Sequence, residues 1–538
     1  MSTLIEQAQA WLAQDPDSET RAELQAFIDA NDEAELKRRF EGRLQFGTAG
    51  LRGRLQAGPN GMNRVLVAQA AAGLARYLGA GKKVVIGYDG RKHSRRFAKD
   101  TAEILQASGI EAYLMPDLRP TPVLAFALRV YQADAGVMVT ASHNPAEDNG
   151  YKVYLGGEHR GAQIVPPADA DIAAEIDYVA QHLRVNELPR DIHYHLIPMS
   201  VIDQYIERTA AVFQSKPVLM NYVYTAMHGV GTETLLDTLH AVGLTQPQLV
   251  ETQAQPDANF PTVAFPNPEE KGALDLAIEL AKKVNAEFII ANDPDADRLA
   301  VALPSSEGVW ERLHGNMVGL YLAWHLAQRA QAQGKKGVFA CSLVSSPLLK
   351  KIAAAYDMTY QETPTGFKWI GRIEGLIFGF EEALGYLVDA DKVADKDGIS
   401  AAIAFLDLMA TLKAQGKTFL DYMQAFQAQF GAFHSQQISI RIEDNEKINR
   451  IINVLREKPF EKVGDYRVMH YCDHLKTAMA SNMLVFELVD GHRVIVRPSG
   501  TEPKLKIYLD TFADNQKTAA EIAAQLAMNI EQFLKMTN

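Results

Sequence analysis

Gly136-Val137-Met138-Val139-Thr140-Ala141-Ser142 is a short apolar run that ends in hydroxyl-bearing residues, and similar runs recur along the chain. They lie at Val84-Val85-Ile86, Glu287-Phe288-Ile289-Ile290 and Gly337-Val338-Phe339-Ala340. Each run has the length of a buried strand, is followed by a polar or Gly/Pro cluster, and alternates with segments of helical periodicity. This alternation predicts an α/β fold whose functional loops follow the strands.

The composition is that of a large globular protein. At 538 residues the chain predicts three or four domains, and 47% hydrophobic with 22% charged residues is enough apolar material for several cores. The net charge of -12 argues against a nucleic-acid or membrane-surface role. Residues 1–29 lack a signal-peptide pattern, no apolar run reaches about 20 residues, and the two cysteines suit a reducing compartment. A cytoplasmic location is therefore predicted.

The last hundred residues differ from the rest. Arg493-Val494-Ile495-Val496 and residues 505–509 read as a hairpin around a long loop, and Lys517 to Lys535 reads as an amphipathic closing helix. We predict four domains with boundaries at residues 1–198, 199–303, 304–432 and 433–538.

The loop Thr140 to Pro145 holds a serine after an apolar strand, where a covalent nucleophile would be fixed in place. His143 lies beside Ser142, and Lys152 follows shortly after, so either can exchange a proton with a substrate hydroxyl. Taken by itself, the loop is better explained as a solvated Asn-Pro turn, and the catalytic interpretation depends on the loops described below.

The loop Asn292 to Arg298 carries Asp293, Asp295 and Asp297 at alternate positions. In an extended segment the three carboxylates point the same way, and hard oxygen ligands suit Mg²⁺ or Ca²⁺. An EF-hand is excluded, because its glycine position holds Arg298 and its terminal glutamate position holds Pro304. The loop predicts a metal site open to a phosphate, with Arg298 beside it; a solvated acidic turn is the alternative.

Four further loops carry polar groups that suit a phosphorylated sugar. Residues 379–385 hold two adjacent glutamates, and residues 497–504 combine glycine, hydroxyls and cations in a way that can cradle a phosphate. Residues 46–53 are glycine-rich and include Arg52, and residues 363–368 carry hydroxyls and a lysine. None has P-loop spacing, so nucleotide binding is not indicated.

In this order along the chain, the four loops at residues 140–145, 293–298, 381–385 and 497–504 resemble those of the α-D-phosphohexomutase superfamily. The resemblance implies three related α/β domains with mixed sheets and a smaller C-terminal α+β domain around a central cleft. It implies an Mg²⁺ site at Asp293, Asp295, Asp297 and the Ser142 phosphate, and catalytic roles for Ser142, His143, Lys152, Arg52 and Arg298. It also implies sugar binding by Thr365, Gly366, Glu381 and Ala383, and phosphate binding by Arg497, Ser499, Gly500, Thr501 and Lys504.

The resemblance implies an isomerase that acts through a phosphoserine and a sugar bisphosphate, which is both intermediate and activator. Phe380 and Ala383 replace the usual glycine and serine of the sugar loop, as in the branch that holds phosphoglucomutase 2 and phosphopentomutase. We predict glucose 1-phosphate and glucose 6-phosphate as substrates, with pentose or mannose phosphates as alternatives. A metal-dependent phosphatase and an inactive sugar-phosphate sensor are the rivals from other classes. The predicted partners are small sugar phosphates only, without nucleic acid or membrane, for a monomer or dimer.

Overall fold

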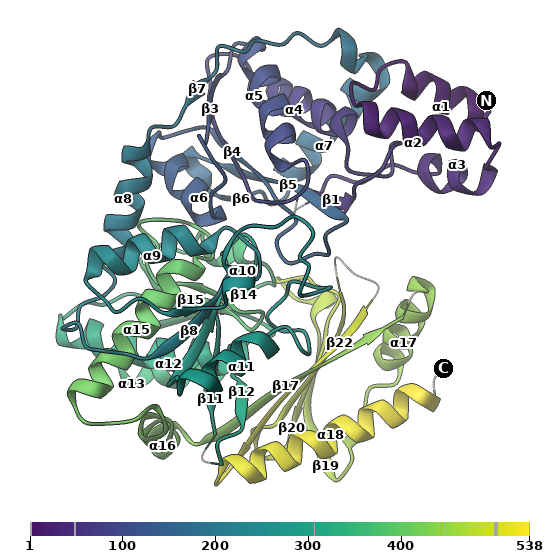
Figure 1. The fold of residues 1–538 in the computed structure, drawn as a ribbon. Coiled ribbons are helices and arrows are strands. Elements are labelled where there is room, and N and C mark those ends of the chain that lie inside the picture. Colours follow the sequence, from purple (N-terminus) through teal and green to yellow (C-terminus); the bar gives the residue numbers. More distant parts are fainter. Residues whose placement is uncertain (1–2, 48–49, 306, 443, 500–503, 537–538) are drawn as a thin grey trace. The chain divides into compact units, whose positions relative to one another are not determined.

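The computed structural model describes residues 3–47, 50–305, 307–442, 444–499 and 504–536. The chain forms two compact units, one of residues 1–312 with 385–410 and one of residues 313–384 with 411–538. Figure 1 shows the helices and strands of both. Strands and helices alternate through most of the chain, as predicted.

The first sheet of unit 1 has the strand order β1-β5-β4-β2-β3-β7, with β6 beside β5. Strands β2, β3, β4 and β7 are parallel neighbours, whereas β5 runs antiparallel to β4 and β1, so the sheet is mixed. Parallel strands end at one edge, and the loops after β2 and β4 therefore leave the sheet side by side. The strands are β1 (Leu51–Arg54), β2 (Lys83–Tyr88), β3 (Glu111–Leu114), β4 (Ala135–Val139), β5 (Asp148–Leu155), β6 (Ala162–Gln163) and β7 (His195–Leu196).

Eight helices accompany this sheet among the described residues. Val85 and Val137 of adjacent strands lie in its core without exposed surface. Gly73 allows α4 to approach α7, because a Cβ there would lie 2.5 Å from Ile176 Cγ1. The helices are α1 (Leu4–Leu12), α2 (Ser18–Asp29), α3 (Glu33–Phe40), α4 (Arg64–Leu78), α5 (Ser94–Ala107), α6 (Thr121–Val130), α7 (Ala168–His182) and α8 (Met199–Ala210).

The second sheet of unit 1 has the order β12-β11-β10-β8-β9. Strands β10 and β11 are antiparallel, and the connection between them is the loop with the three aspartates. Phe405 of α15 packs edge-on against Phe288 of β10, with ring centroids 5.5 Å apart. The remaining elements of unit 1 are β8 (Tyr222–Thr225), α9 (Gly231–Val242), β9 (Gln248–Leu249), α10 (Glu251–Ala254), α11 (Asp275–Val284), β10 (Phe288–Ala291), β11 (Ala300–Pro304), β12 (Trp310–Arg312), α15 (Gly398–Ala414) and β16 (Gly385–Leu387), which is not a strand of this sheet.

Unit 2 begins with three parallel strands in the order β14-β13-β15. Aromatic side chains join two of its helices: Trp324 of α12 stacks on Tyr422 of α16, with ring centroids 4.5 Å apart. Its elements up to residue 430 are α12 (Gly315–Ala332), β13 (Val338–Ser342), α13 (Leu348–Ala355), β14 (Thr359–Thr363), α14 (Phe367–Ile370), β15 (Leu376–Glu381) and α16 (Phe419–Phe430).

The C-terminal part of unit 2 is an antiparallel sheet of order β17-β22-β21-β20-β19-β18, with two helices. The predicted hairpin is formed by β21 and β22, and the predicted closing helix is α18. Arg493 pairs with Asp510 and donates to the carbonyls of Leu343 and Ser345, which joins this sheet to the segment after β13. The elements are β17 (Ala432–Arg441), α17 (Asn445–Glu457), β18 (Lys462–Val463), β19 (Tyr466–Asp473), β20 (Leu484–Leu488), β21 (Arg493–Pro498), β22 (Lys504–Ala513) and α18 (Gln516–Met536).

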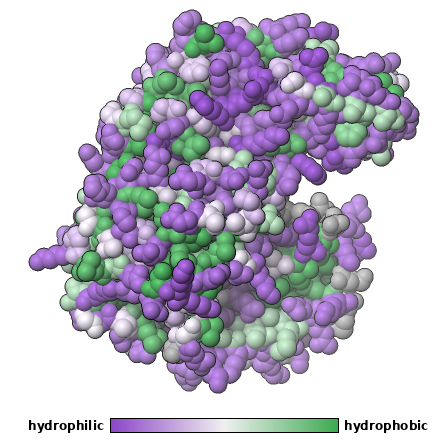
Figure 2. Space-filling model, in the orientation of Figure 1, coloured by the Kyte–Doolittle hydropathy of each residue, from purple (hydrophilic) through white to green (hydrophobic). Residues whose placement is uncertain are grey.

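The visible surface in Figure 2 is mostly hydrophilic, with hydrophobic residues scattered among polar ones. Among the described helices, none combines the length and the apolar character that crossing a bilayer requires. Cys341 is buried, and both Cys341 and Cys472 are free thiols. The four domain boundaries predicted above stay predictions.

Candidate functional site

The serine loop follows β4 and places Ser142 inside the protein. Ser142 has a φ of +52° and is 2% exposed, and its N–H donates to Thr140 Oγ1 at 2.8 Å. A left-handed conformation is unfavourable for a residue with a side chain and is typical of functional sites. The Ser142 Oγ–H donates to Asp293 Oδ2 at 2.8 Å, across 151 positions of sequence.

A single guanidinium holds the backbone of this loop. Arg91, 4% exposed, donates from Nη2 to the carbonyls of Ser142 at 2.6 Å and of Asn144, and from Nη1 to those of Pro145 at 2.7 Å and Asp148 at 3.1 Å. The sequence reasoning missed this residue, although Arg91 follows the strand at residues 84–86. Four bonds to one side chain fix the conformation that carries Ser142.

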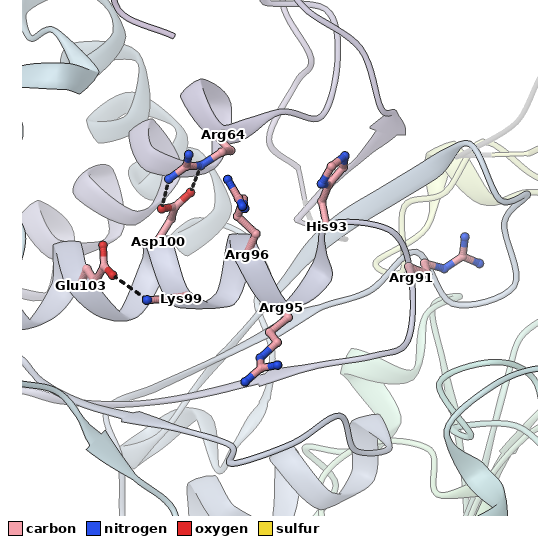
Figure 3. Close-up of a pocket in the computed structure, with 8 residues that line it drawn as sticks. All are labelled: Arg64, Arg91, His93, Arg95, Arg96, Lys99, Asp100 and Glu103. Atoms are coloured by element: carbon pink, nitrogen blue, oxygen red, sulfur yellow. Dashed lines mark hydrogen bonds and ion pairs between the residues drawn. The ribbon is translucent and has the colours of Figure 1, made fainter. Parts of the chain in front are cut away.

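Arg91 also lines a cavity of about 650 Å³ at the start of α5, shown in Figure 3. Arg64 pairs there with Asp100, and Lys99 lies near Glu103. None of the residues predicted as catalytic or substrate-binding lines it. Its lining residues are Arg64, Arg91, His93, Arg95, Arg96, Lys99, Asp100 and Glu103.

The three aspartates of the second loop converge, but not for the reason that the sequence suggested. Residues 294–296 form a turn rather than an extended strand, with Ala296 at φ +54° and its N–H bonded to Asp293 O at 2.9 Å. The expected extended geometry is wrong, because the chain has to reverse between the antiparallel strands β10 and β11. Within the turn, one carboxylate oxygen each of Asp293, Asp295 and Asp297 lies within 4.8 Å of the others.

These residues fit a divalent cation. All three aspartates are at most 1% exposed, and the Oδ1 atoms of Asp295 and Asp297 accept no hydrogen bond from any described residue. Buried carboxylate oxygens without donors are costly unless a cation binds them. Oxygen ligands of this kind suit Mg²⁺.

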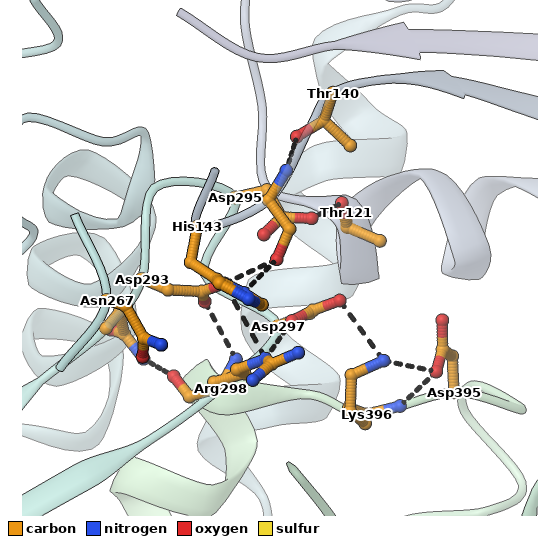
Figure 4. A network of polar contacts seen from close by, with 12 residues as sticks. Thr121, Thr140, His143, Asn267, Asp293, Asp295, Asp297, Arg298, Asp395 and Lys396 are labelled. Atoms are coloured by element: carbon orange, nitrogen blue, oxygen red, sulfur yellow. Dashed lines mark hydrogen bonds and ion pairs between the residues drawn. The ribbon is translucent and has the colours of Figure 1, made fainter. Parts of the chain in front are cut away.

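Cations of the protein surround the aspartates, as Figure 4 shows. Lys152 Nζ lies 2.7 Å from Asp295 Oδ2 and 3.1 Å from Asp297 Oδ2. Lys396 Nζ lies 3.2 Å from Asp297 Oδ2, and Arg298 Nε lies 3.8 Å from Asp297 Oδ1. The second aspartate, Asp295, also accepts from Thr121 Oγ1 at 2.6 Å. Each aspartate is therefore held in a different environment.

The environments move the pKa values of the aspartates apart. Burial, followed by the charges of Asp295 and Asp297, raises the pKa of Asp293 well above 3.8. Burial also acts to raise the pKa of Asp297, but the charges of Lys152, Lys396 and Arg298 outweigh it and lower that pKa. Without a further cation, Asp293 is thus the carboxylate on which a proton is held most readily.

The two predicted proton carriers differ in charge. His143 Nδ1 lies 3.2 Å from Ser142 Oγ, and burial together with the charges of Arg298 and Arg52 lowers the pKa of His143 well below 6.5. Burial acts to lower the pKa of Lys152, but Asp295 and Asp297 outweigh it and raise that pKa. At neutral pH the imidazole is therefore uncharged and the ammonium charged.

Lys396 and Asp395 were missed by the sequence reasoning. Lys396 lies in the segment between β16 and α15 and contacts Asp297 and Asp395, while Asp395 accepts from Tyr154 OH at 2.8 Å. The signal was present in Asp395-Lys396-Asp397-Gly398, where charges end in a glycine. A Cβ at Gly398 would lie 2.3 Å from Arg298 O, so only glycine lets this segment reach the aspartate loop. Of the remaining predicted residues in unit 1, Arg52 donates to Asn144 Oδ1 at 3.3 Å.

The predicted sugar-binding residues lie together in unit 2. Glu381, at the end of β15, accepts from the Gly366 N–H at 2.7 Å. Thr365 precedes Gly366 in the chain, and Ala383 follows Glu381 by two residues. Glu382 turns the other way: it is 5% exposed and accepts from Ser345 Oγ at 3.2 Å. The two adjacent glutamates therefore have different partners.

The predicted phosphate-binding residues also lie in unit 2. Arg497 is the last residue but one of β21, Lys504 begins β22, and Ser499 N–H donates to Lys504 O at 2.8 Å. All three are half-buried. Gly500 and Thr501 lie outside the described residues. The two cations thus flank the loop between the strands.

Comparison with known families matches the chain along most of its length. Four domain families of phosphoglucomutase/phosphomannomutase match the chain in order. They are alpha/beta/alpha domain I at residues 43–182, domain II at 203–306, domain III at 314–430 and the C-terminal domain at 441–528.

Related proteins carry the names of three sugar phosphate mutases. A Haemophilus influenzae protein named "Probable phosphomannomutase" is 57% identical, covering 88% of this chain and 98% of its own. The Homo sapiens phosphopentomutase is 34% identical over 95% of this chain and 92% of its own. A Staphylococcus epidermidis phosphoglucomutase is 34% identical over 89% of this chain and 92% of its own.

The fold is also that of a solved structure. The crystal structure of pp63/parafusin, a phosphoglucomutase from Paramecium, matches with a TM-score of 0.69 at 21% identity, covering 92% of this chain and 94% of that one. With all four domains matched in order, and with relatives aligned over nearly their whole length, the chain belongs to the phosphoglucomutase/phosphomannomutase family of the α-D-phosphohexomutase superfamily and is a phosphosugar mutase, an isomerase.

Proposed function

We propose that the chain interconverts glucose 1-phosphate and glucose 6-phosphate through a phosphoserine at Ser142. The observation that carries this proposal is the 2.8 Å contact between Ser142 Oγ and Asp293, within a buried cluster of three carboxylates. A hydroxyl beside three potential metal ligands suits phosphoryl transfer, in which positioning and charge neutralisation supply most of the catalysis.

In the proposed reaction, a sugar hydroxyl loses its proton and attacks the phosphorus of phospho-Ser142, the bond from phosphorus to Ser142 Oγ breaks, and Oγ takes up a proton. The product is a sugar bisphosphate, which turns over and returns its other phosphoryl group to Ser142. The neutral imidazole of His143 is placed to take or return the proton at Ser142 Oγ, 3.2 Å away. The charged Lys152 donates hydrogen bonds and neutralises charge, and Arg52 and Arg298 assist.

The charges of the site favour Mg²⁺ as the cofactor. When all three are ionised, the side chains of Asp293, Asp295 and Asp297 carry three negative charges, and those of Lys152, Lys396 and Arg298 carry three positive ones. The protein alone is thus nearly balanced, whereas phospho-Ser142 adds about two negative charges. Mg²⁺ bound by the aspartates and the phosphate would neutralise the charge on the transferred group.

We propose that the sugar is bound by Thr365, Gly366, Glu381 and Ala383, and its phosphate by Arg497, Ser499, Gly500, Thr501 and Lys504. Glucose and mannose differ only in configuration at C2, so relatives named for either support a hexose. Pentose phosphates are the second candidate, because relatives named phosphopentomutase align over nine-tenths of their length. Ala383 lacks a hydroxyl that would bind the sugar, which is consistent with either. A cytoplasmic location and a monomeric or dimeric state remain predictions.

A turnover panel tests the proposal. The purified enzyme is given the 1-phosphates of glucose, mannose, glucosamine, ribose and deoxyribose, with Mg²⁺ and a trace of the matching bisphosphate. We expect the highest kcat/KM for glucose 1-phosphate, with little free phosphate. A preference for ribose or deoxyribose would replace glucose by the second candidate. Stoichiometric release of phosphate would indicate a phosphatase, and binding without turnover a sensor.

A further inference from the structure

Lys396 has two acidic chain neighbours, and the structure gives them different partners. Lys396 Nζ lies 3.0 Å from Asp395 Oδ1 and 3.2 Å from Asp297 Oδ2 of the aspartate loop. Asp397, the next residue, is fully buried but pairs with another cation, Lys392. We infer that the carboxylate contacted by the Lys396 ammonium depends on which neighbouring carboxylates already have a cation.

Lys392 is buried to the same degree as the core around it. It is 2% exposed, and its Nζ lies 2.7 Å from Asp397 Oδ2. Nζ also donates to Thr209 Oγ1 at 2.6 Å and to Ser400 Oγ, and it lies 4.3 Å from the centroid of the Tyr205 ring. An ammonium needs such a complete set of partners when water is absent.

Both carboxylate oxygens of Asp397 also have hydrogen-bond partners. Its Oδ1 accepts from Tyr205 OH at 2.8 Å and from the Ser400 N–H at 2.9 Å, and its Oδ2 accepts from Ser400 Oγ at 2.7 Å. Its N–H donates to Tyr386 O at 2.9 Å. Asp397 thus stands at the start of α15 with every carboxylate oxygen occupied, and no acceptor site is left for Lys396.

A buried ion pair of this kind is weak evidence of a stabilising role. Replacing both partners by uncharged groups is often neutral or favourable, whereas removing one partner leaves an uncompensated charge. In this segment, Lys392 pairs with Asp397, whereas Lys396 pairs with Asp297, the carboxylate that the proposed phosphoryl transfer uses.

We propose that Lys392 is a positioning residue, which by neutralising Asp397 directs Lys396 to Asp297 in the phosphoryl-transfer site. The proposal rests on the proposed function of that site. Lys392 contacts neither the aspartate loop nor Ser142 in any described contact, so its effect is exerted through Lys396.

Two single variants separate positioning from stability. Lys392→Met and Asp397→Asn both break the same pair, and both should lower Tm by ~5 °C or more. Only Lys392→Met leaves the Asp397 charge unpaired, so only it should draw Lys396 away from Asp297. We expect kcat to fall ~10- to 100-fold in Lys392→Met with KM within ~3-fold, while Asp397→Asn stays within ~3-fold of the wild type in both.

The double variant Lys392→Met/Asp397→Asn removes both charges and should recover the kcat of Asp397→Asn. Arg64→Met, which breaks a largely buried ion pair with Asp100 at 2.6 Å, is the matched stability control and should keep kcat. Rates are measured well below the Tm of each variant and are divided by the concentration of folded enzyme. Equal losses of kcat in both single variants, or none in Lys392→Met, would overturn the positioning role.

A crystal structure of Lys392→Met gives a readout that does not depend on activity. Lys396 Nζ should leave Asp297 and lie within hydrogen-bonding distance of the Asp397 carboxylate. Lys396 remaining within 3.5 Å of Asp297 would contradict the proposal. If the wild type turned over no sugar phosphate, the proposed function would fail, and this distance would still decide the role of Lys392.

Discussion

The aspartate site of unit 1 and the loops of unit 2 are built differently. Asp293, Asp295 and Asp297 are at most 1% exposed and lie among cations at hydrogen-bonding distance. Glu381 and Arg497 are half-buried at the ends of strands. Buried charges require fixed partners, whereas half-buried ones leave space for a ligand. In the proposed function, the phosphoryl-transfer chemistry therefore depends on the first region, and the choice of sugar on the second.

The largest effect is expected at Ser142. Ser142→Ala removes the only proposed phosphoryl carrier, so kcat should fall at least ~10⁴-fold while the circular dichroism spectrum is retained. Ser108→Ala, a substitution at the C-cap of α5 away from the site, serves as the control and should keep full activity. Retained turnover in Ser142→Ala would show that the phosphoryl group is carried elsewhere.

Removing one aspartate should separate metal binding from folding. Asp295→Asn is expected to lower kcat ~10³-fold, because it deletes one potential metal ligand and the partner of Lys152. Mg²⁺ should stabilise the wild type by ~2.7 kcal/mol at 100 times its Kd, and the variant much less. Calorimetry with and without Mg²⁺ measures the stabilisation of the wild type and of the variant. The substitution Asp203→Asn, at an exposed position of α8, is the control. An identical Mg²⁺-dependent rise in Tm for Asp295→Asn and wild type would contradict the metal site.

A smaller effect, of a different kind, is expected in unit 2. A hydrogen bond from a cation to a phosphate contributes about 1.5–3 kcal/mol, so Arg497→Ala should raise KM ~10- to 100-fold. The value of kcat should change less, because the contact is to the substrate and not to the transferred group. Arg467→Ala, on exposed β19 of the same sheet, is the control. A fall confined to kcat would break the division between chemistry and recognition.

The smallest effect concerns pH. The folded protein holds the pKa of His143 below 6.5, so below that pH the unfolded chain binds a proton that the folded one does not. The free energy of unfolding should therefore fall with decreasing pH, by at most about 1.4 kcal/mol per unit from this residue. His143→Gln should have a flatter profile between pH 7.5 and 5.5 in denaturant titrations, and the exposed His240→Gln should not. Parallel profiles for His143→Gln and wild type would exclude this contribution.

Local pattern was sufficient for much of the fold. The apolar runs at residues 84–86 and 136–139 became β2 and β4, and the hairpin and closing helix of the C-terminal part were predicted. Such features depend on periodicity within a few residues, which the chain displays directly. The turn at Ala296 was not predicted, because the reversal is imposed by the pairing of β10 with β11.

The long-range partners of the site were not predictable in the same way. Arg91 meets the serine loop across 51 positions or more, and Lys396 meets Asp297 across 99, and neither has a spacing that one sequence reveals. Thr121 is an ordinary helix-start residue until the fold brings it to Asp295. Residues that act through tertiary contact alone therefore need the structure.

The position of Ser142 determines how the enzyme can be charged with phosphate. Ser142 is 2% exposed, has a left-handed backbone and is held by Arg91, so it cannot be bound as part of an extended peptide. For the proposed phosphoserine, this geometry favours a small phosphate donor that enters the site over a protein kinase that reads extended peptides. We then expect the active fraction of the enzyme to follow the supply of that donor.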